Sequence, residues 1–246
     1  DSCLKMVAKN NQILSDDVLE KFPIEYFSMN TGIYYDLDRE EDMEKIISHT
    51  NTARRKAREQ VDGICAYTEE LAHAELLRAD VLHSFQSALE KEEFILYFQP
   101  KISGKNAEIT SAEVLVRWQR ADGEIWGPNK FISVLEECGK VEALDFYVYE
   151  KAFQWMISQR ECRTQPVTLS LNISPFHFRD IEGFTRKLLD IINKYEIDTR
   201  YLIFEITESA YIRNRDAVNK MISILHEYHI RISMDDFGSG YSSLNT

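Results

Sequence analysis

Two adjacent carboxylates, Asp235 and Asp236, end a strand-like segment and are followed by the glycine-rich sequence FGSGYSS. Adjacent carboxylates repel each other, and in a sequestered site one of them takes up a proton unless a cation keeps both ionised. The pair therefore raises the question of whether other residues complete a cation site. A glycine-rich loop at this place could close over such a site.

Three other strand-like segments each carry an oxygen ligand. Glu113 lies within segment 109–119, Asn172 near the end of 167–174, and Glu205 within 201–209. In parallel α/β folds, functional residues gather at the carboxyl ends of the strands. A single acid in a strand is usually an edge or surface residue, but ligands on four strands in succession favour one shared site.

The chemistry of these side chains favours hard divalent cations. Oxygen ligands without histidine or cysteine are typical of Mg²⁺ or Mn²⁺ sites rather than Zn²⁺ sites. Four carboxylates and one amide suit two ions better than one, and a pair of metal ions can clamp a phosphate and activate a water. Asp235 and Asp236 would then both stay charged, as a bridge between the two ions.

Arg117 follows Glu113 by four residues, which places both side chains on one face of a strand. The guanidinium fork of an arginine at this position could bind a phosphate oxygen. The alternative is an internal salt bridge to one of the acids. The sequence leaves both open.

Composition excludes some classes of function. The chain has 246 residues, of which 44% are hydrophobic, and a net charge of −12, so DNA binding through a basic surface is not expected. No apolar run approaches the roughly 18 residues of a membrane span, and the first residues lack the pattern of a signal peptide. The four cysteines are scattered, without a C-x-x-C motif, and we interpret them as reduced thiols of a cytoplasmic protein.

From residue 94 onward, strand-like and helix-like segments alternate, which predicts a parallel sheet closed or covered by helices. Before it, segment 69–91 has apolar residues at helical spacing and is either a connector between two packed units or an ordinary core-facing helix. The first part of the chain is expected to be mixed α/β. The predicted strands are 24–38, 94–100, 109–119, 167–174, 201–209 and 230–236, and the predicted helices are 39–60, 69–91, 129–139, 145–160, 181–197 and 215–229.

Five sequence segments, taken in order, resemble the motifs of EAL domains, the bacterial cyclic di-GMP phosphodiesterases. AEVLVRW (112–118) is similar to the signature motif, and the others are LYFQP (96–100), SLNIS (170–174), FEITES (204–209) and MDDFGSGYSSL (234–244). The resemblance implies a modified (β/α)₈ TIM-like barrel whose first strand is antiparallel to the rest. It also implies hydrolysis of cyclic di-GMP to linear pGpG with two Mg²⁺ or Mn²⁺ ions. Five strands cannot close an eight-stranded barrel, so we expect the C-terminal strands to be missing.

Position by position, the resemblance assigns roles to eight residues. Glu208 would hold the loop after the Asp pair, a loop that is implicated in dimerisation in the family, so a homodimer through this domain is expected. The catalytic set is Glu113, Asp235 and Glu208, and the substrate contacts are Gln99 and Arg117. The implied metal ligands are Glu113, Asn172, Glu205, Asp235 and Asp236.

The chain also departs from the family pattern. The signature reads EVL, with Val114 in place of alanine, and His177 stands where a glutamine is common. A later lysine, glutamate and glutamine of the family have no counterpart in this sequence. The alternative function is therefore a catalytically inactive cyclic di-GMP receptor that signals through segment 69–91.

The N-terminal part resembles the C-terminal part of a GGDEF domain, the diguanylate cyclase module that often precedes EAL domains. FSMNTGIYY (27–35) is similar to a strand of that domain, and 39–60 to its last helix, but the sequence has no intact GGDEF motif. We expect no cyclase activity from it. The predicted organisation is a partial, degenerate GGDEF-like domain (1–62), a connecting helix (63–91) and an EAL domain truncated at its C-terminus (92–246).

Overall fold

The computed structural model describes residues 2–22, 27–35, 42–58, 60–104, 108–161 and 166–235. The chain divides into two compact units, Asp1–Ala79 and Asp80–Thr246. Among the described residues, no helix is long and apolar enough to cross a membrane.

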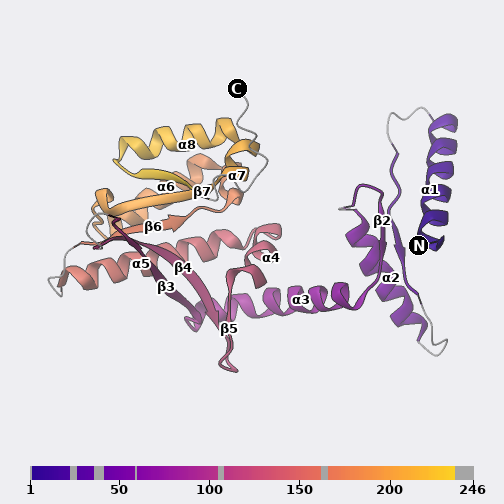
Figure 1. Ribbon diagram of the computed structural model, residues 1–246, viewed down its shortest axis with the longest axis horizontal. Helices are drawn as coiled ribbons and strands as arrows, with labels where there is room; N and C mark the ends of the chain where they lie inside the picture. The colour runs from indigo at the N-terminus through magenta and orange to yellow at the C-terminus, as the bar shows by residue number, and fades with distance from the viewer. Residues whose placement is uncertain are drawn as a thin grey trace. The chain divides into compact units, whose positions relative to one another are not determined.

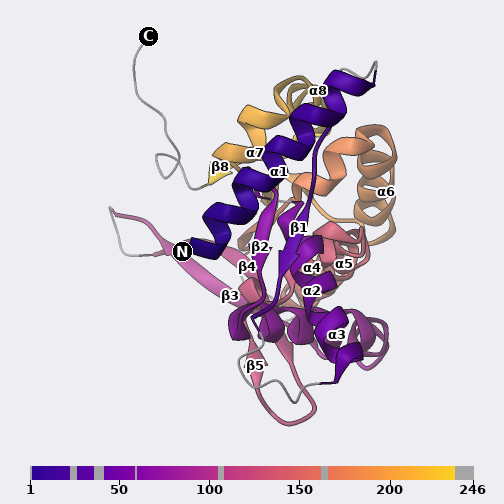
Figure 2. The same ribbon diagram turned by 90° about the vertical axis from the view of Figure 1, so that its right-hand side faces the viewer.

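The first unit is built on a two-stranded parallel sheet, with α1 and α2 on its opposite faces (Figure 1, Figure 2). Gly32 lets α2 approach this sheet, because a Cβ atom at this position would come within 2.1 Å of the Thr50 carbonyl oxygen. The side chain of Asp42 caps the start of α2 by accepting from the Glu44 backbone N–H. The elements are α1 (Ser2–Lys21), β1 (Thr31–Ile33), α2 (Met43–Ala57) and β2 (Ile64–Ala66), and α3 (Glu69–Glu90) begins in this unit.

Only some elements of this unit could be predicted from the sequence. It predicted α2 but not α1, whose apolar residues include Met6, Ile13 and Leu14, all exposed. The described part of segment 24–38 is a strand only over Thr31–Ile33. Strand β2 lies within the range predicted for the connecting helix and was not predicted, because three residues give no measurable alternation.

The second unit contains a six-stranded sheet with the order β3-β4-β6-β7-β8, to which β5 adds by pairing with β4. Strand β3 runs antiparallel to β4, whereas β4, β6, β7 and β8 are parallel. The predicted parallel sheet is confirmed, and its first strand has the antiparallel direction that the family resemblance implies. The strands are β3 (Phe94–Ile102), β4 (Ile109–Gln119), β5 (Ile125–Trp126), β6 (Thr168–Asn172), β7 (Leu202–Thr207) and β8 (Arg231–Asp235).

Helices connect the parallel strands and cover the apolar side of the sheet. Successive residues of a strand point to opposite sides, and Leu169, Leu171 and Phe204 on this side are completely buried. Tyr149 of α5 contacts Phe204 of β7, with ring centroids 5.4 Å apart. The helices are α4 (Ile132–Glu137), α5 (Val141–Glu161), α6 (Ile181–Lys194), α7 (Glu208–Arg213) and α8 (Arg215–Glu227), with short 3₁₀ turns η1 (Pro128–Lys130), η2 (Pro175–Arg179) and η3 (Thr199–Tyr201).

An aromatic cluster fixes the β3–β4 hairpin. The Trp118 ring is completely buried and lies 4.7 Å from the Phe94 ring and 5.6 Å from the Phe131 ring, measured between centroids. Its indole N–H donates to Glu93 Oε2 over 3.0 Å. This packing holds the end of the hairpin at which Phe94 pairs with Trp118.

Candidate metal centre

The strand register places the predicted ligands on one side of the sheet. Glu113 pairs with Ser170, Asn172 with Glu205, and Asp235 with Thr207. Residues paired across a parallel ladder point to the same side, and so do residues two apart in one strand. The four predicted ligands within the described residues therefore share the side opposite to the helix-covered one.

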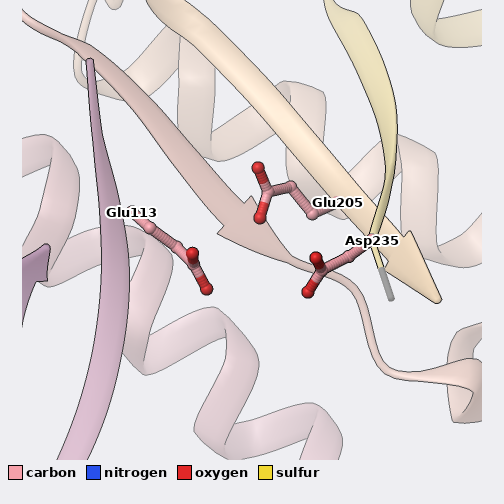
Figure 3. A group of neighbouring side chains, drawn as sticks. All are labelled: Glu113, Glu205 and Asp235. Atoms are coloured by element: carbon pink, nitrogen blue, oxygen red, sulfur yellow. The ribbon is translucent and has the colours of Figure 1, made fainter. Parts of the chain in front are cut away.

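Three carboxylates converge on this side (Figure 3). Glu113, Glu205 and Asp235 each offer one oxygen atom, and these atoms lie within 4.8 Å of one another. Figure 3 shows the side chains extending from β4, β7 and β8 toward a common space. Such a group of oxygen donors suits a hard divalent cation.

Glu205 supplies an independent observation in favour of a cation. Only 4% of this residue is exposed. Its Oε1 atom accepts hydrogen bonds from Lys101 Nζ over 2.6 Å and from Ser233 Oγ over 3.3 Å, whereas Oε2 is buried and has no hydrogen-bond partner among the described residues. A buried acceptor without a partner costs about 1–3 kcal/mol, and more when it is charged. A metal ion coordinated by Oε2 would remove that cost, so the residues fit the ion.

Lys101 is a member of the cluster that the sequence did not indicate. Besides its bond to Glu205, its Nζ atom lies 3.8 Å from Glu113 Oε2 and 3.4 Å from Ser170 Oγ. Burial lowers the pKa of Lys101, but the hydrogen bond to Glu205 and the charges of Glu205, Glu113 and Asp235 outweigh it, and the pKa is raised. The only signal in the sequence was its position two residues after Gln99, on the same side of β3.

Asn172 lies beside the carboxylates at the end of β6. It stands opposite Glu205 in the register, and the residue is exposed. Its backbone carbonyl accepts a hydrogen bond from the buried Tyr149 hydroxyl over 2.8 Å. Helix α5 therefore fixes the backbone of this strand end. Asp236 and the glycine-rich loop that follows lie outside the described residues.

The predicted substrate contacts lie on the same side of the sheet. Gln99 pairs with Glu113 across the β3–β4 hairpin. The Arg117 guanidinium lies 5.5 Å from the centre of the Tyr97 ring and donates to the Val116 carbonyl over 2.8 Å. Within the described part of the chain Arg117 forms no ion pair with an acid, so an internal salt bridge is not observed there.

Glu208 is the first residue of α7, and 5% of it is exposed. Thr207 caps this helix, its hydroxyl accepting from the Ala210 backbone N–H over 3.3 Å. The loop that Glu208 is expected to hold is outside the described residues. Its role therefore stays a prediction.

Comparisons with known proteins identify chains that are related to this one. The family model "EAL domain" matches residues 82–246. The cyclic di-GMP phosphodiesterase PdeR of Escherichia coli is 30% identical over 223 residues, which cover 89% of this chain and 33% of PdeR. An uncharacterised Synechocystis protein, sll1895, is 32% identical over 181 residues, which cover 74% of this chain and 26% of that protein.

Solved structures of related proteins also match this chain. A structure titled as the PaMucR phosphodiesterase in complex with c-di-GMP is 27% identical, with a TM-score of 0.62, and the match covers 67% of this chain and 66% of that one. The chain spans about a third or less of the length of the two curated relatives named above.

Proposed function

Because the chain belongs to the EAL-domain family, we propose that it is a phosphodiesterase that hydrolyses cyclic di-GMP to linear pGpG. Two Mg²⁺ or Mn²⁺ ions at the carboxylate cluster are part of this proposal. The observation that carries it is the convergence of Glu113, Glu205 and Asp235, together with a buried Glu205 oxygen that has no hydrogen-bond partner among the described residues. PdeR and PaMucR, which are similar to this chain, are named as phosphodiesterases.

Some residues of this chain would hold the ions, and others would orient the substrate. Glu113, Asn172, Glu205, Asp235 and Asp236 would hold the ions. Divalent ions bound there supply Lewis-acid stabilisation of the charge that develops on the phosphoryl oxygens.

Arg117, four residues after Glu113 in β4, and Gln99, the register partner of Glu113 in β3, lie on the same side of the sheet and would bind the substrate. The Arg117 fork matches two oxygens of a phosphate. Hydrolysis breaks one phosphorus–oxygen bond of the cyclic dinucleotide, the oxygen of water ends on phosphorus, and a proton ends on the released sugar oxygen. Glu208 would keep the loop after Asp236 in place.

Incubation of the chain with cyclic di-GMP and Mg²⁺ or Mn²⁺ tests the proposal, with pGpG measured by chromatography. We expect pGpG from the native chain and none from Glu113→Gln, which keeps the shape of the side chain and removes a charged ligand. Binding of cyclic di-GMP without turnover would instead support the inactive receptor. Equal turnover by the native chain and Glu113→Gln would contradict the role of Glu113.

Further features belong to the same proposal. The sheet of the second unit would be part of a modified (β/α)₈ barrel that forms homodimers. The first unit would be a partial, degenerate GGDEF-like domain, which the parallel β1–β2 pair and α2 support. The exposed free thiols of Cys3 and Cys138 support a reducing location such as the cytoplasm.

A further inference from the structure

The ammonium group of Lys101 lies at the carboxylate cluster itself. It is 2.6 Å from Glu205 Oε1 and 3.8 Å from Glu113 Oε2. Both contacts are made by a side chain from β3, the outer strand that runs antiparallel to β4, β6, β7 and β8. A charged nitrogen at hydrogen-bond distance from a predicted metal ligand takes up space beside that ligand. It also neutralises part of the negative charge that would attract a metal ion.

The contact differs from an ordinary surface ion pair because its two partners are unequally buried. The Glu205 side chain is 5% exposed, whereas the Lys101 side chain is 42% exposed. A buried carboxylate without a cation nearby is strongly disfavoured, so Glu205 depends on Lys101 when no metal is bound. Lys101, by contrast, has a flexible four-carbon stem and can move its charge into water.

One ammonium group also neutralises the cluster incompletely. Three carboxylates face it, and Glu205 Oε2 keeps no partner among the described residues. The positive charge of the Lys101 ammonium group would repel a divalent ion bound to the same carboxylates. The two states, with the ammonium group at Glu205 Oε1 or with a divalent ion on the same carboxylate, therefore oppose each other.

We propose that Lys101 is a tethered counter-ion that holds the position beside Glu205 in the metal-free protein and must leave it when a divalent ion binds, which lowers the affinity of the site for metal. This inference rests on the proposed metal-dependent function. In this proposal, Lys101 determines the metal-ion concentration at which the site becomes occupied.

Titration of the full chain with Mn²⁺ alone, at one pH and ionic strength and with free Mn²⁺ measured by electron paramagnetic resonance, tests the inference. We expect Lys101→Met to bind Mn²⁺ about tenfold more tightly than the native chain, a figure that allows for screening of a partly exposed charge. Lys101→Arg, which keeps the charge, should bind more weakly than Lys101→Met. Lys220→Met is the matched control, because it removes the same charge from an exposed pair with Glu182, and we expect it to bind as the native chain does.

Thermal unfolding gives a second readout. Without metal, Lys101→Met should melt below the native chain, because Glu205 loses its counter-ion. With saturating Mn²⁺ the increase in its Tm should exceed that of the native chain, because tighter binding to the folded state stabilises it more. If Lys101→Met does not fold, Lys101→Gln, which keeps a hydrogen-bond donor, takes its place in both measurements.

The outcomes separate this inference from the proposed function. Mn²⁺ binding that is unchanged or weaker in Lys101→Met than in the native chain would overturn the inference. Unchanged Mn²⁺ binding with weaker cyclic di-GMP binding would also overturn it and make Lys101 a substrate contact. If the native chain and Glu113→Gln bind Mn²⁺ equally, the metal centre of the proposed function fails as well.

Discussion

The surroundings of Arg117 bear on which of two roles it has. Its guanidinium stays near the Tyr97 ring and the Val116 carbonyl, and no ion pair with an acid holds it among the described residues. The sequence left two roles open for this side chain. The structure favours the one in which the fork is available to a phosphate.

We predict that Arg117→Ala weakens binding of cyclic di-GMP by about 10–100-fold, the range for loss of a hydrogen bond to a charged group. Mn²⁺ affinity should stay within about twofold, because no carboxylate loses a partner. Isothermal titration with each ligand measures both. Arg200→Ala, which removes an exposed arginine paired with Asp198, is the control. Equal losses of metal and substrate affinity would mean that Arg117 supports the acids instead.

At the residue scale, the sequence could predict which acids converge, but not what neutralises them. Glu113, Glu205 and Asp235 follow from the rule that functional residues gather at strand ends. Lys101 could not be predicted because segment 94–100 was expected to end at Pro100. In the structure Pro100 pairs with Ala112 and β3 continues to Ile102, which is possible because an outer strand tolerates proline.

At the scale of the elements, helix α5 supports two strands through two tyrosine hydroxyls. Tyr149 donates to the Asn172 carbonyl over 2.8 Å at the candidate metal centre, and Tyr147 donates to the Phe94 carbonyl over 3.1 Å at the start of β3. The two bonds are chemically alike. They differ in which strand end they fix.

Tyr149→Phe should therefore lower the free energy of unfolding by about 1–2 kcal/mol, because a backbone carbonyl loses its partner. It should also weaken Mn²⁺ binding by about tenfold, as changes behind a ligand do. Tyr147→Phe is the matched control and should affect stability alone. Urea unfolding and Mn²⁺ titration measure the two effects. Identical Mn²⁺ affinity in both variants would show that α5 does not position Asn172.

His177, in the turn η2, forms a buried pair with Asp145 of α5. Its Nε2 atom lies 2.8 Å from Asp145 Oδ2, and its ring stacks on Phe184 with centroids 4.2 Å apart. Burial raises the pKa of Asp145, and the hydrogen bond to His177 opposes that rise. His177, which stands where a glutamine is common in the family, thus has Asp145 as a defined hydrogen-bond partner.

We predict that His177→Ala lowers the free energy of unfolding by about 3–5 kcal/mol near neutral pH, because it leaves Asp145 buried and unpaired. Without His177 the pKa of Asp145 in the folded state rises further above its unfolded value. The stability lost then grows as the pH rises through that folded pKa, and it is smaller below it, where the carboxyl is protonated. Chemical unfolding across this pH range measures the effect. His177→Gln should recover part of the stability, and a cost independent of pH would contradict the pairing.

The elements themselves could be predicted where the period of the apolar residues was long enough. Strands β4, β6 and β7 and helices α5, α6 and α8 lie within a few residues of the predicted segments. Helix α1 and the short strands β2 and β5 were not predicted, because none of the three has a regular apolar pattern long enough to indicate its type. Register, which decides which side chains meet, follows from pairing between distant segments.

At the scale of the whole molecule, the chain consists of two compact units, and the candidate metal centre belongs to the second. We predict that calorimetry resolves their unfolding and that saturating Mn²⁺ shifts the transition of the second unit alone. Metal at about 100 times its Kd adds about 2.7 kcal/mol to the unit that binds it, and this raises its Tm by about 5–10 °C. Glu113→Gln should abolish the shift. A shift of both transitions by the same amount would show that the units unfold together.

Anomalous diffraction from crystals grown with Mn²⁺ tests most directly whether Glu113, Glu205 and Asp235 form a divalent metal site. We expect one or two anomalous peaks about 2.0–2.4 Å from oxygens of these three carboxylates, with the Lys101 ammonium moved away from Glu205. Peaks elsewhere, with Lys101 still bonded to Glu205 and none among the three carboxylates, would contradict it.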